Sequence, residues 1–349
     1  MVKNLKPNAR SIEYWRKRTL DLEEALNKRG LDYYKELVKA YDKAIRETER
    51  EITKLYTKLA SENNVSLSEA KKLLQGKELA EFKWTLEDYI KHAKESGVDN
   101  RWIRQLENAS LKARISRLEA MQIAMRQQVE LLLDTEGVEL SKMLSDTYVE
   151  GYYRTTHMIQ TGLGVSSAFT SLDTNRIEKV LSKPWIGNKV FSDRWGENKT
   201  SLIEELYKQL TQSVMRGESP DKAINTIAKR FNVSKRRAGT LIMTESAYFG
   251  NLAQQDSYKE LDVEEQIFVA TLDLKTSEIC REMDGKILKT SDVEIGVNAP
   301  PLHCNCRSVL APYFEGNVTE RSARGKDGKT YYVDGSLTYE EWYKKYVEN

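Results

Sequence analysis

ASLKARISRLEAMQIAMRQQVELLL, residues 109–133, repeats large apolar side chains at steps of three and four. This spacing places the side chains on one face of an α-helix. The apolar positions are Leu111, Ile115, Leu118, Met121, Met125, Val129 and Leu132. Because the near-heptad pattern lasts only about three repeats, it favours packing on neighbouring helices of the same chain over a free coiled coil. The segment therefore predicts a long helix in a mainly α protein.

The same periodicity extends outward in both directions. Residues 138–160 continue the helix, and residues 34–59 carry another apolar stripe. Residues 201–214 and 219–258 carry the stripes of a second helical block. Within that block Ser201 begins a capping-box spacing, which predicts a helix start there. We expect a long-helix N-terminal region followed by a second helical region.

The composition changes after Val263. Residues 266–272 (QIFVATL) are β-branched and aromatic, which predicts a strand. Asp284-Gly285 predicts a tight turn before a short return strand at Ile287-Leu288. Residues 307–311 (RSVLA) predict a last short strand. Together these elements predict a small α+β knuckle at the C-terminal side of the helices.

The chain divides at changes in its sequence pattern. Gly162 and Gly164 interrupt the helical pattern, which predicts a hinge. The predicted organisation is a helical N-terminal region at 1–160, a hinge at 161–175, a helical region at 176–260, the knuckle at 261–315 and a tail at 316–349. In the tail, residues 316–336 predict a mobile loop and residues 339–349 (YEEWYKKYVEN) a small aromatic helix.

The overall composition excludes several classes of protein. The 349 residues include 55 Lys and Arg against 53 Asp and Glu, and a net charge of +2 predicts no strong global attraction to nucleic acid. We expect no membrane span and no signal peptide, because no apolar stretch is long enough for either. Three cysteines cannot form a disulfide framework, so a reducing cytoplasm is the simplest compartment. The GxSxG, HExxH, Walker A and GxGxxG motifs are absent, so none of the common catalytic motifs points to an enzyme.

Positive charge gathers locally in two clusters. The first, within residues 1–18, contains Lys3, Lys6, Arg10, Arg16, Lys17 and Arg18. The second contains Lys229, Arg230, Lys235, Arg236 and Arg237. Either cluster can contact DNA phosphates, and the second is the stronger candidate. The alternative is a solvated terminus and a solvated helix end.

Residues 219–256 have the outline of a helix-turn-helix. The predicted break lies at Phe231-Asn232, and Ser234 is placed to cap the next helix. A DNA-binding regulator would put that second helix in the major groove. The second helix is rich in apolar residues, however, which favours a helical hairpin packed inside a larger domain.

All three cysteines and one of the three histidines lie within residues 280–306. Thiolate and imidazole are the ligands that structural zinc prefers. The favoured ligands are Cys280, His303 and Cys306, because Cys304 directly follows His303 and is expected to point away. Asp273 and Asp284 are the candidates for a fourth ligand. The alternatives are packed thiols beside a histidine that is hydrogen-bonded to backbone, or a reactive Cys–His pair.

The run LDLKTSEICREMDGK (272–286), followed by PPLHCNCRS (300–308), resembles the C-terminal signature of phage head-morphogenesis proteins. These are the Mu F-like minor head (minor capsid) proteins of tailed phages, and the resemblance extends over most of residues 35–312. The matching motif positions are Thr244, Glu245, Asp273, Asp284, Gly285, Pro300, Pro301 and Arg307. In many relatives cysteine occupies the positions of Ser277 and Ser308.

The resemblance implies a non-enzymatic structural role in the virion. It implies a minor head protein that associates with the portal protein, joins capsid and scaffold proteins during assembly and binds DNA without sequence preference. It implies a location in the phage head near the portal, and in the host cytoplasm during assembly, with no membrane contact. The rival interpretations are the helix-turn-helix regulator and a metal-dependent nuclease or toxin built on Cys280, His303 and Cys306. About 40 residues follow Arg307, which is too few for a fused enzyme domain.

Overall fold

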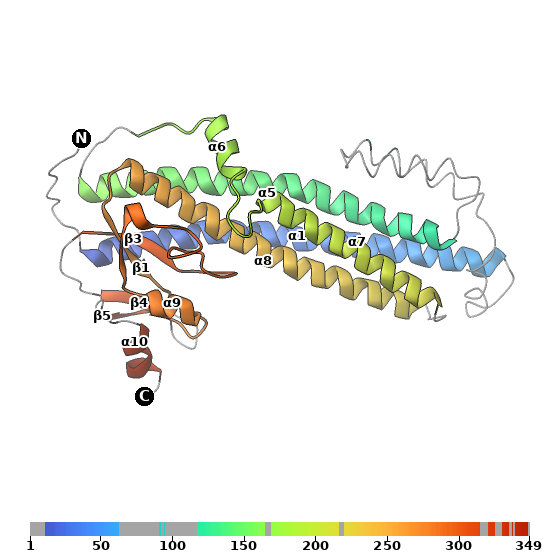
Figure 1. The fold of residues 1–349 in the computed structure, drawn as a ribbon. Helices are drawn as coiled ribbons and strands as arrows, with labels where there is room; N and C mark the ends of the chain where they lie inside the picture. Colours follow the sequence, from blue (N-terminus) through green and yellow to red (C-terminus); the bar gives the residue numbers. More distant parts are fainter. Residues whose placement is uncertain are drawn as a thin grey trace. The chain divides into compact units, whose positions relative to one another are not determined.

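A computed structural model describes residues 11–62, 91, 94, 117–164, 169–215, 220–314, 320–324, 330–334, 337 and 339–347 (Figure 1). The described residues are 73% helical and carry a small antiparallel sheet near the C-terminus, which confirms the predicted mainly α fold. Lys3, Lys6, Arg10, His92 and the first residues of the 109–133 stretch lie outside the described residues.

The helices and strands follow one another in a simple order. The helices are α1 (Ile12–Glu62), α5 (Arg117–Leu163), α6 (Thr174–Leu181), α7 (Phe191–Met215), α8 (Pro220–Glu260), α9 (Glu278–Met283) and α10 (Tyr339–Tyr346), with a 3-10 turn at Thr290–Asp292. The strands are β1 (Glu265–Val269), β2 (Ile287–Lys289), β3 (Val309–Tyr313), β4 (Glu320–Arg324) and β5 (Thr330–Asp334).

The chain forms two compact units, each assembled from separate segments. Unit 1 comprises the described residues within 1–32, 142–191 and 240–349. Unit 2 comprises those within 33–141 and 192–239. The helices α1, α5 and α8 therefore contribute residues to both units. The predicted succession of segments along the chain stays a prediction, because these units group residues by contact and not by sequence order.

Helical segments from α1, α5, α7 and α8 make up most of the described part of unit 2. The apolar stripe of α5 forms much of its core: Met121, Met125 and Val129 are at most 1% exposed. Lys199 of α7 forms ion pairs with Glu130 and Asp134 of α5, at 2.8 and 2.7 Å. The apolar side chains spaced three and four residues apart therefore face neighbouring helices of the same chain, as the periodicity predicted.

The predicted break at Phe231-Asn232 is wrong, because α8 is one continuous helix through this point. Phe231 is fully buried in unit 2, and the hydroxyl of Ser234 lies 2.9 Å from the Tyr41 hydroxyl of α1 instead of capping a new helix. Both side chains belong to a packed helix face, and this packing overrides the local preference of Asn and Ser for turns. The segment is neither a helix-turn-helix nor a helical hairpin.

The predicted helix start at Ser201 is also wrong. α7 begins upstream at Phe191, because Phe191 and Trp195 extend the buried stripe in that direction. The indole Nε1 of Trp195 donates a hydrogen bond of 2.8 Å to the carbonyl of Leu133. Ser201 therefore lies inside the helix, where its hydroxyl accepts a hydrogen bond from Arg237.

In unit 1, the helical segments of α1, α5 and α8 pack closely through small residues. A Cβ atom on Gly151 would lie 3.0 Å from Cβ of Ala253 and 3.3 Å from Leu26. A Cβ on Gly250 would lie 3.2 Å from the same leucine. These glycines let the three helices approach each other and form the base on which the knuckle rests.

The knuckle is a three-stranded antiparallel sheet in the order β2-β1-β3. The central strand pairs Ile267 with Ile287 of β2 and with Ala311 of β3. Alternate side chains of β1 point to opposite faces, as a strand requires. Ile267 and Val269 pack with Ile12 of α1, whereas Phe268 packs with Cys280 and Cys306. Phe268 therefore faces the cysteine site, whereas Ile267 and Val269 face Ile12 of α1.

The prediction of a loop over residues 316–336 is wrong for its described parts. β4 and β5 pair as an antiparallel hairpin from Glu320↔Asp334 to Arg324↔Thr330. Ala323 and Val333 are buried with Leu272, Tyr339 and Trp342, so this otherwise polar segment has one apolar face. The predicted aromatic helix at the C-terminal end is α10, and it closes the same cluster.

The described part of the predicted hinge is bonded to the helices of unit 1. The backbone of Thr170 accepts a hydrogen bond from the Tyr152 hydroxyl at 2.9 Å and donates one to Glu260. The backbone N–H of Leu172 donates to the Tyr153 hydroxyl at 3.1 Å.

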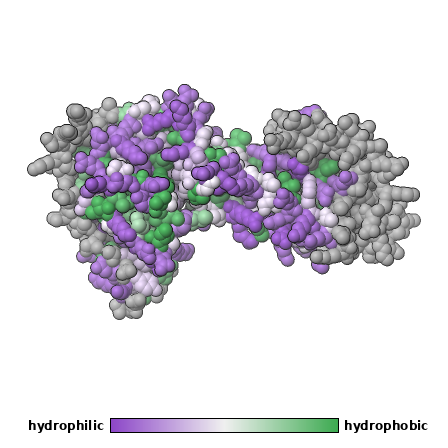
Figure 2. Space-filling model, in the orientation of Figure 1, coloured by the Kyte–Doolittle hydropathy of each residue, from purple (hydrophilic) through white to green (hydrophobic). Residues whose placement is uncertain are grey.

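The side of the molecule shown in Figure 2 is mostly hydrophilic, with smaller hydrophobic areas. No helix in the described part of the chain is both long and apolar enough to cross a membrane.

Candidate functional site

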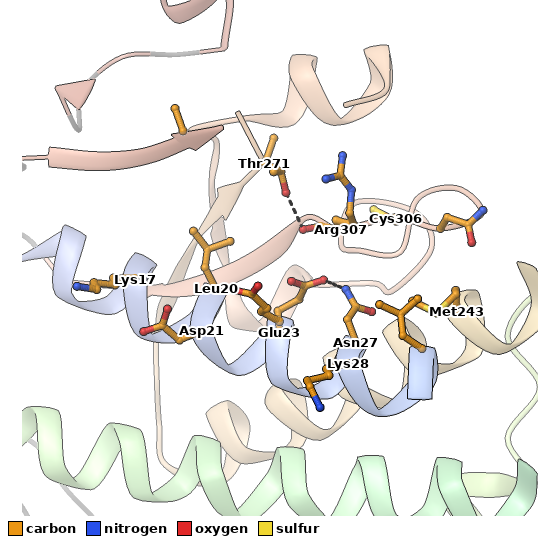
Figure 3. A pocket seen from close by; sticks show the side chains of 15 residues that line it. Lys17, Leu20, Asp21, Glu23, Asn27, Lys28, Met243, Thr271, Cys306 and Arg307 are labelled. Carbon is orange, nitrogen blue, oxygen red and sulfur yellow. Dashed lines mark hydrogen bonds between the residues drawn. The ribbon is translucent and has the colours of Figure 1, made fainter. Parts of the chain in front are cut away.

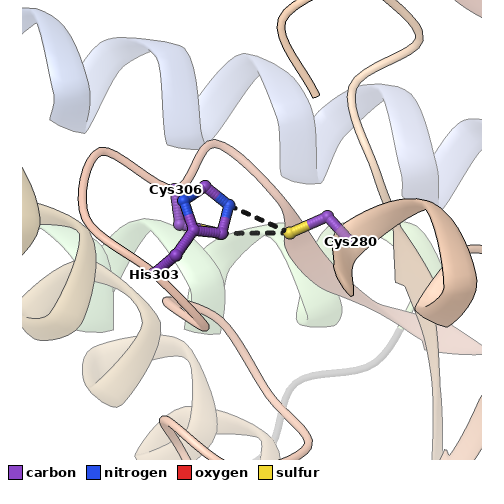
Figure 4. A group of neighbouring side chains, drawn as sticks. All are labelled: Cys280, His303 and Cys306. Carbon is purple, nitrogen blue, oxygen red and sulfur yellow. Dashed lines mark hydrogen bonds between the residues drawn. The ribbon is translucent and has the colours of Figure 1, made fainter. Parts of the chain in front are cut away.

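Cys280, His303 and Cys306 come together in the knuckle (Figure 4). Cys280 lies on α9, and the other two residues lie on the loop that leads into β3. The Sγ of Cys280 is 3.3 Å from Nε2 of His303 and 3.6 Å from Sγ of Cys306. The three ligand atoms lie within 4.8 Å of one another, and both sulfur atoms belong to buried residues.

The orientation of His303 follows from its second ring nitrogen. Nδ1 lies 2.9 Å from the backbone carbonyl of Cys304, and a carbonyl oxygen can only accept a hydrogen bond. Nδ1 therefore carries the proton, which leaves a lone pair on Nε2 in the neutral ring, directed at Cys280. Cys304 itself is exposed and stands apart from the group.

The pKa values of the two buried thiols are shifted in opposite directions. The Cys306 thiol is placed to donate a hydrogen bond to the Cys280 sulfur, and this bond lowers the pKa of Cys280 below that of a free thiol. The same bond, together with burial, raises the pKa of Cys306. Cys280 is therefore the thiol that ionises first.

The two aspartates considered as fourth ligands have other partners. Among the described residues, no carboxylate joins Cys280, His303 and Cys306. Asp273 binds Arg307, and Asp284 accepts a hydrogen bond of 2.9 Å from the backbone N–H of Ala270. The expectation of an aspartate ligand is therefore wrong. The sequence could not show that each carboxylate satisfies a buried donor elsewhere in the knuckle.

Asp273 and Arg307 form a two-pronged ion pair, with N–O distances of 2.6 and 2.9 Å. Burial alone would raise the pKa of Asp273, but the hydrogen bonds and charge of Arg307 outweigh it and hold this pKa below its ordinary value. The hydrogen bonds that Arg307 donates to Asp273 raise the pKa of Arg307 in turn. The pair joins the segment before α9 to the segment after Cys306, and so brackets the cysteine site.

Other motif residues shape the turns around the site. Gly285 has a φ of +79°, which favours glycine, and its N–H donates to the carbonyl of Phe268 at 2.9 Å. Pro300 and Pro301, joined by a cis peptide bond, are buried just before His303. Their positions give the motif a structural explanation in this chain.

Thr244 and Glu245 connect α8 to the knuckle. The hydroxyl of Thr244 accepts a hydrogen bond of 3.2 Å from the backbone N–H of Asn305, between His303 and Cys306. Glu245, 1% exposed, accepts a hydrogen bond of 3.1 Å from the indole of Trp185. Trp185 stacks on Tyr248 of α8 with ring centroids 4.2 Å apart. Sequence reasoning missed Trp185, although an aromatic residue between Pro184 and Gly187 in a polar turn is a visible signal.

A cavity of about 700 Å³ lies between α1 and the knuckle in unit 1 (Figure 3). Leu20, Glu23 and Asn27 of α1 line one wall, and Thr271 and Cys306 line the other. Of the cysteine group, Cys306 lines this cavity, although the residue is only 2% exposed.

The second basic cluster does not form one surface. Lys235 forms an ion pair of 2.8 Å with Asp42, and Arg237 lies 3.4 Å from Glu205, which is also 3.9 Å from Arg230. Lys229 and Arg236, seven residues apart, share one face of α8 and are exposed. These two residues are the cations of the cluster that remain best placed to meet DNA phosphates.

The described end of the N-terminal basic cluster meets Arg154 and His157 of α5 in unit 1. Lys17 and Arg18 line a cavity of about 550 Å³ with Arg154 and His157. Asp21 lies in the same cavity, and Arg154 forms an ion pair of 2.9 Å with Glu150. This second basic surface combines residues far apart in sequence, so the sequence alone could not assemble it.

Comparison with known proteins identifies one region of the chain. No curated protein and no solved structure matches the chain. Residues 204–311 match the family model described as Phage Mu protein F like protein. The match includes the motif residues, the cysteine group and the knuckle as far as residue 311 within β3, and it ends before the β4–β5 hairpin. Residues 204–311 therefore form a Mu F-like region, and this family suggests a phage head-morphogenesis protein.

Proposed function

We propose that the protein is a minor head protein that docks at the portal vertex during head assembly and contacts packaged DNA without sequence preference. The observation that carries the proposal is the family match over 204–311. The motif residues of that region form a connected set of buried bonds and turns, so the region has a rigid scaffold on which partners can dock.

Exposed apolar side chains on the knuckle are consistent with a protein partner. Leu274, Ile279 and Ile287 are each 44–46% exposed, and Val297 is 64% exposed. Single exposed apolar residues are ordinary, but several on one small subdomain favour an interaction surface. We assign the docking surface for the portal, or for capsid and scaffold proteins, to the knuckle.

The proposed DNA contacts are Lys229 and Arg236 of α8, with the surface around Lys17 and Arg18 as the second. Both surfaces carry exposed cations, which is what attraction to the phosphate backbone requires. A structural role without catalysis accords with the family match.

The rivals have less support. The continuous α8 lacks the turn that a helix-turn-helix regulator needs. A metal-dependent nuclease would need a general base beside its metal, and among the described residues no carboxylate stands beside Cys280, His303 and Cys306.

Purified heads test the proposal. The chain would be co-expressed with cognate portal, scaffold and major head proteins, and the assembled heads would be pelleted and analysed by mass spectrometry. We expect the chain in the pellet at a small number of copies per head. Its complete absence from heads that assemble normally would contradict the proposal.

A further inference from the structure

We propose that Cys280, Cys306 and His303 bind a zinc ion that fastens α9 to the loop before β3. This inference is independent of the proposed role in the head, because it concerns only the internal chemistry of the knuckle. The three residues would then form a structural metal site, and would be neither simply packed thiols nor a reactive Cys–His pair.

The spacing of the ligand atoms fits a tetrahedral ion. With Zn–S bonds of about 2.3 Å and Zn–N bonds of about 2.05 Å, two sulfur ligands lie about 3.8 Å apart, and a sulfur and a nitrogen about 3.6 Å. The observed separations from Cys280 Sγ are 3.6 Å to Cys306 Sγ and 3.3 Å to His303 Nε2. All three atoms lie within 4.8 Å, so a small rotation of the imidazole completes the face of a tetrahedron.

The ligands are held in place by bonds outside the cluster. His303 donates from Nδ1 to a backbone carbonyl, the usual arrangement that directs Nε2 at a metal. The backbone N–H of Cys306 donates to the carbonyl of His303 at 3.2 Å, and Thr244 holds Asn305 between them. The loop therefore presents both of its ligands before any ion is bound.

The fourth ligand of the proposed zinc ion would be a hydroxyl group or a water molecule. The Ser277 hydroxyl, one helical turn before Cys280, is buried and hydrogen-bonds to the Cys280 sulfur, with no oxygen or nitrogen partner among the described residues. An ion bound to that sulfur would therefore lie close to this hydroxyl. The cavity that reaches Cys306 gives an ion a path to the site.

Metal analysis of the purified full-length chain tests this inference. Protein prepared in zinc-supplemented medium would be dialysed and its metal content measured by mass spectrometry. We expect about one zinc ion per chain. Cys280→Ser and His303→Gln should each reduce the zinc content at least fivefold, and Cys304→Ser, the matched control at an exposed cysteine, should leave it unchanged.

Cobalt substitution gives an independent readout of ligand identity. Cobalt(II) added to the apoprotein should produce a thiolate-to-cobalt charge-transfer band in the wild type and in Cys304→Ser, and a much weaker one in Cys306→Ser. Circular dichroism would establish that each variant is folded, and His303→Gln is the variant that disturbs packing least.

Three results would overturn the inference. They are a folded wild type that takes up neither metal, equal metal loss in Cys304→Ser and Cys280→Ser, and a native protein whose intact mass shows a Cys280–Cys306 disulfide. Each of these is distinguishable from failure of the head proposal, because none depends on head assembly.

Discussion

At the scale of single residues, the two-pronged ion pair between Asp273 and Arg307 links two segments of the knuckle. Asp273 is 8% exposed, and besides Arg307 its carboxylate accepts from the backbone N–H of Lys275 and from the Thr276 hydroxyl. Replacing it by Asn leaves Arg307 half-buried without its counter-charge. We expect Asp273→Asn to lower the free energy of unfolding by about 1.5 kcal/mol at pH 7.

The same change has a predictable pH dependence. Because the folded pKa of Asp273 lies below its ordinary value of 3.8, its contribution to stability is complete above that value and is lost as the pH falls through the folded pKa. Denaturation curves of the wild type and Asp273→Asn should therefore converge below about pH 4. Asp262→Asn, an exposed aspartate at a φ of 54° that Asn also tolerates, should show a small difference with no such convergence. A constant gap between wild type and Asp273→Asn across the acid range would contradict this assignment.

The sequence could suggest these residues but not their pairing. The cluster of Cys280, His303 and Cys306 was predictable, because thiols and imidazole gather in one short segment. The partners of Asp273 and Asp284 were not predictable. The sequence alone does not distinguish a carboxylate that binds a metal from one that binds a backbone N–H. Trp185 was missed because its partner Glu245 lies 60 positions further along the chain.

At the scale of helices, two glycines in unit 2 should respond oppositely to the same substitution. A Cβ on Gly196 of α7 meets nothing within 4 Å, whereas a Cβ on Gly239 of α8 would lie 2.6 Å from the ring of Tyr34. Alanine is favoured over glycine inside a helix by about 1 kcal/mol. We expect Gly196→Ala to raise the free energy of unfolding by about 0.5–1 kcal/mol, and Gly239→Ala to lower it, because the Tyr34 ring must move. Urea denaturation measures both, and equal stabilisation by the two variants would show that α1 and α8 are not packed as described.

The C-terminal hairpin and α10 should be integral to the knuckle, although the family match ends before them. Trp342 is 1% exposed and donates from its indole to the Tyr331 hydroxyl at 2.8 Å. The Tyr339 hydroxyl donates to the carbonyl of Asp273 at 2.9 Å, so α10 reaches the motif itself. We expect Trp342→Ala to cost about 3–5 kcal/mol, and Tyr346→Ala, at a position 43% exposed, less than about 1 kcal/mol. Similar melting temperatures for the two variants would mean that α10 is an appendage.

Periodicity was the reliable guide to the elements and local turn chemistry was not. The stripes of α5 and α8 were visible because each repeats over many turns. Helix starts were wrongly predicted at Ser201 and Ser234 because serine favours N-cap positions. In the structure, burial of Trp195 and Phe231 keeps each helix continuous through these residues. The β4–β5 hairpin was hidden because only Ala323 and Val333 mark its buried face.

At the scale of the whole molecule, DNA binding should depend on a few exposed cations. The slope of log K against log salt is negative, and each lost phosphate contact reduces its magnitude by about 0.9 on duplex DNA. Lys229→Glu/Arg236→Glu should therefore reduce the slope by about 1.8. The matched control, Lys142→Glu/Lys208→Glu, makes the same charge change at exposed lysines outside the proposed contacts and should change the slope far less. Equal loss in both variants would indicate general electrostatic attraction and remove this surface as a site.

The central claim is that this chain is a minor head protein that joins heads by docking on the portal. The most direct measurement compares heads assembled with and without cognate portal protein, purified by sedimentation, and counts copies of the chain per head by quantitative mass spectrometry. The account predicts a few copies in heads that contain the portal and a loss of at least tenfold in heads that lack it. Equal incorporation in both preparations, or none in either, would contradict it.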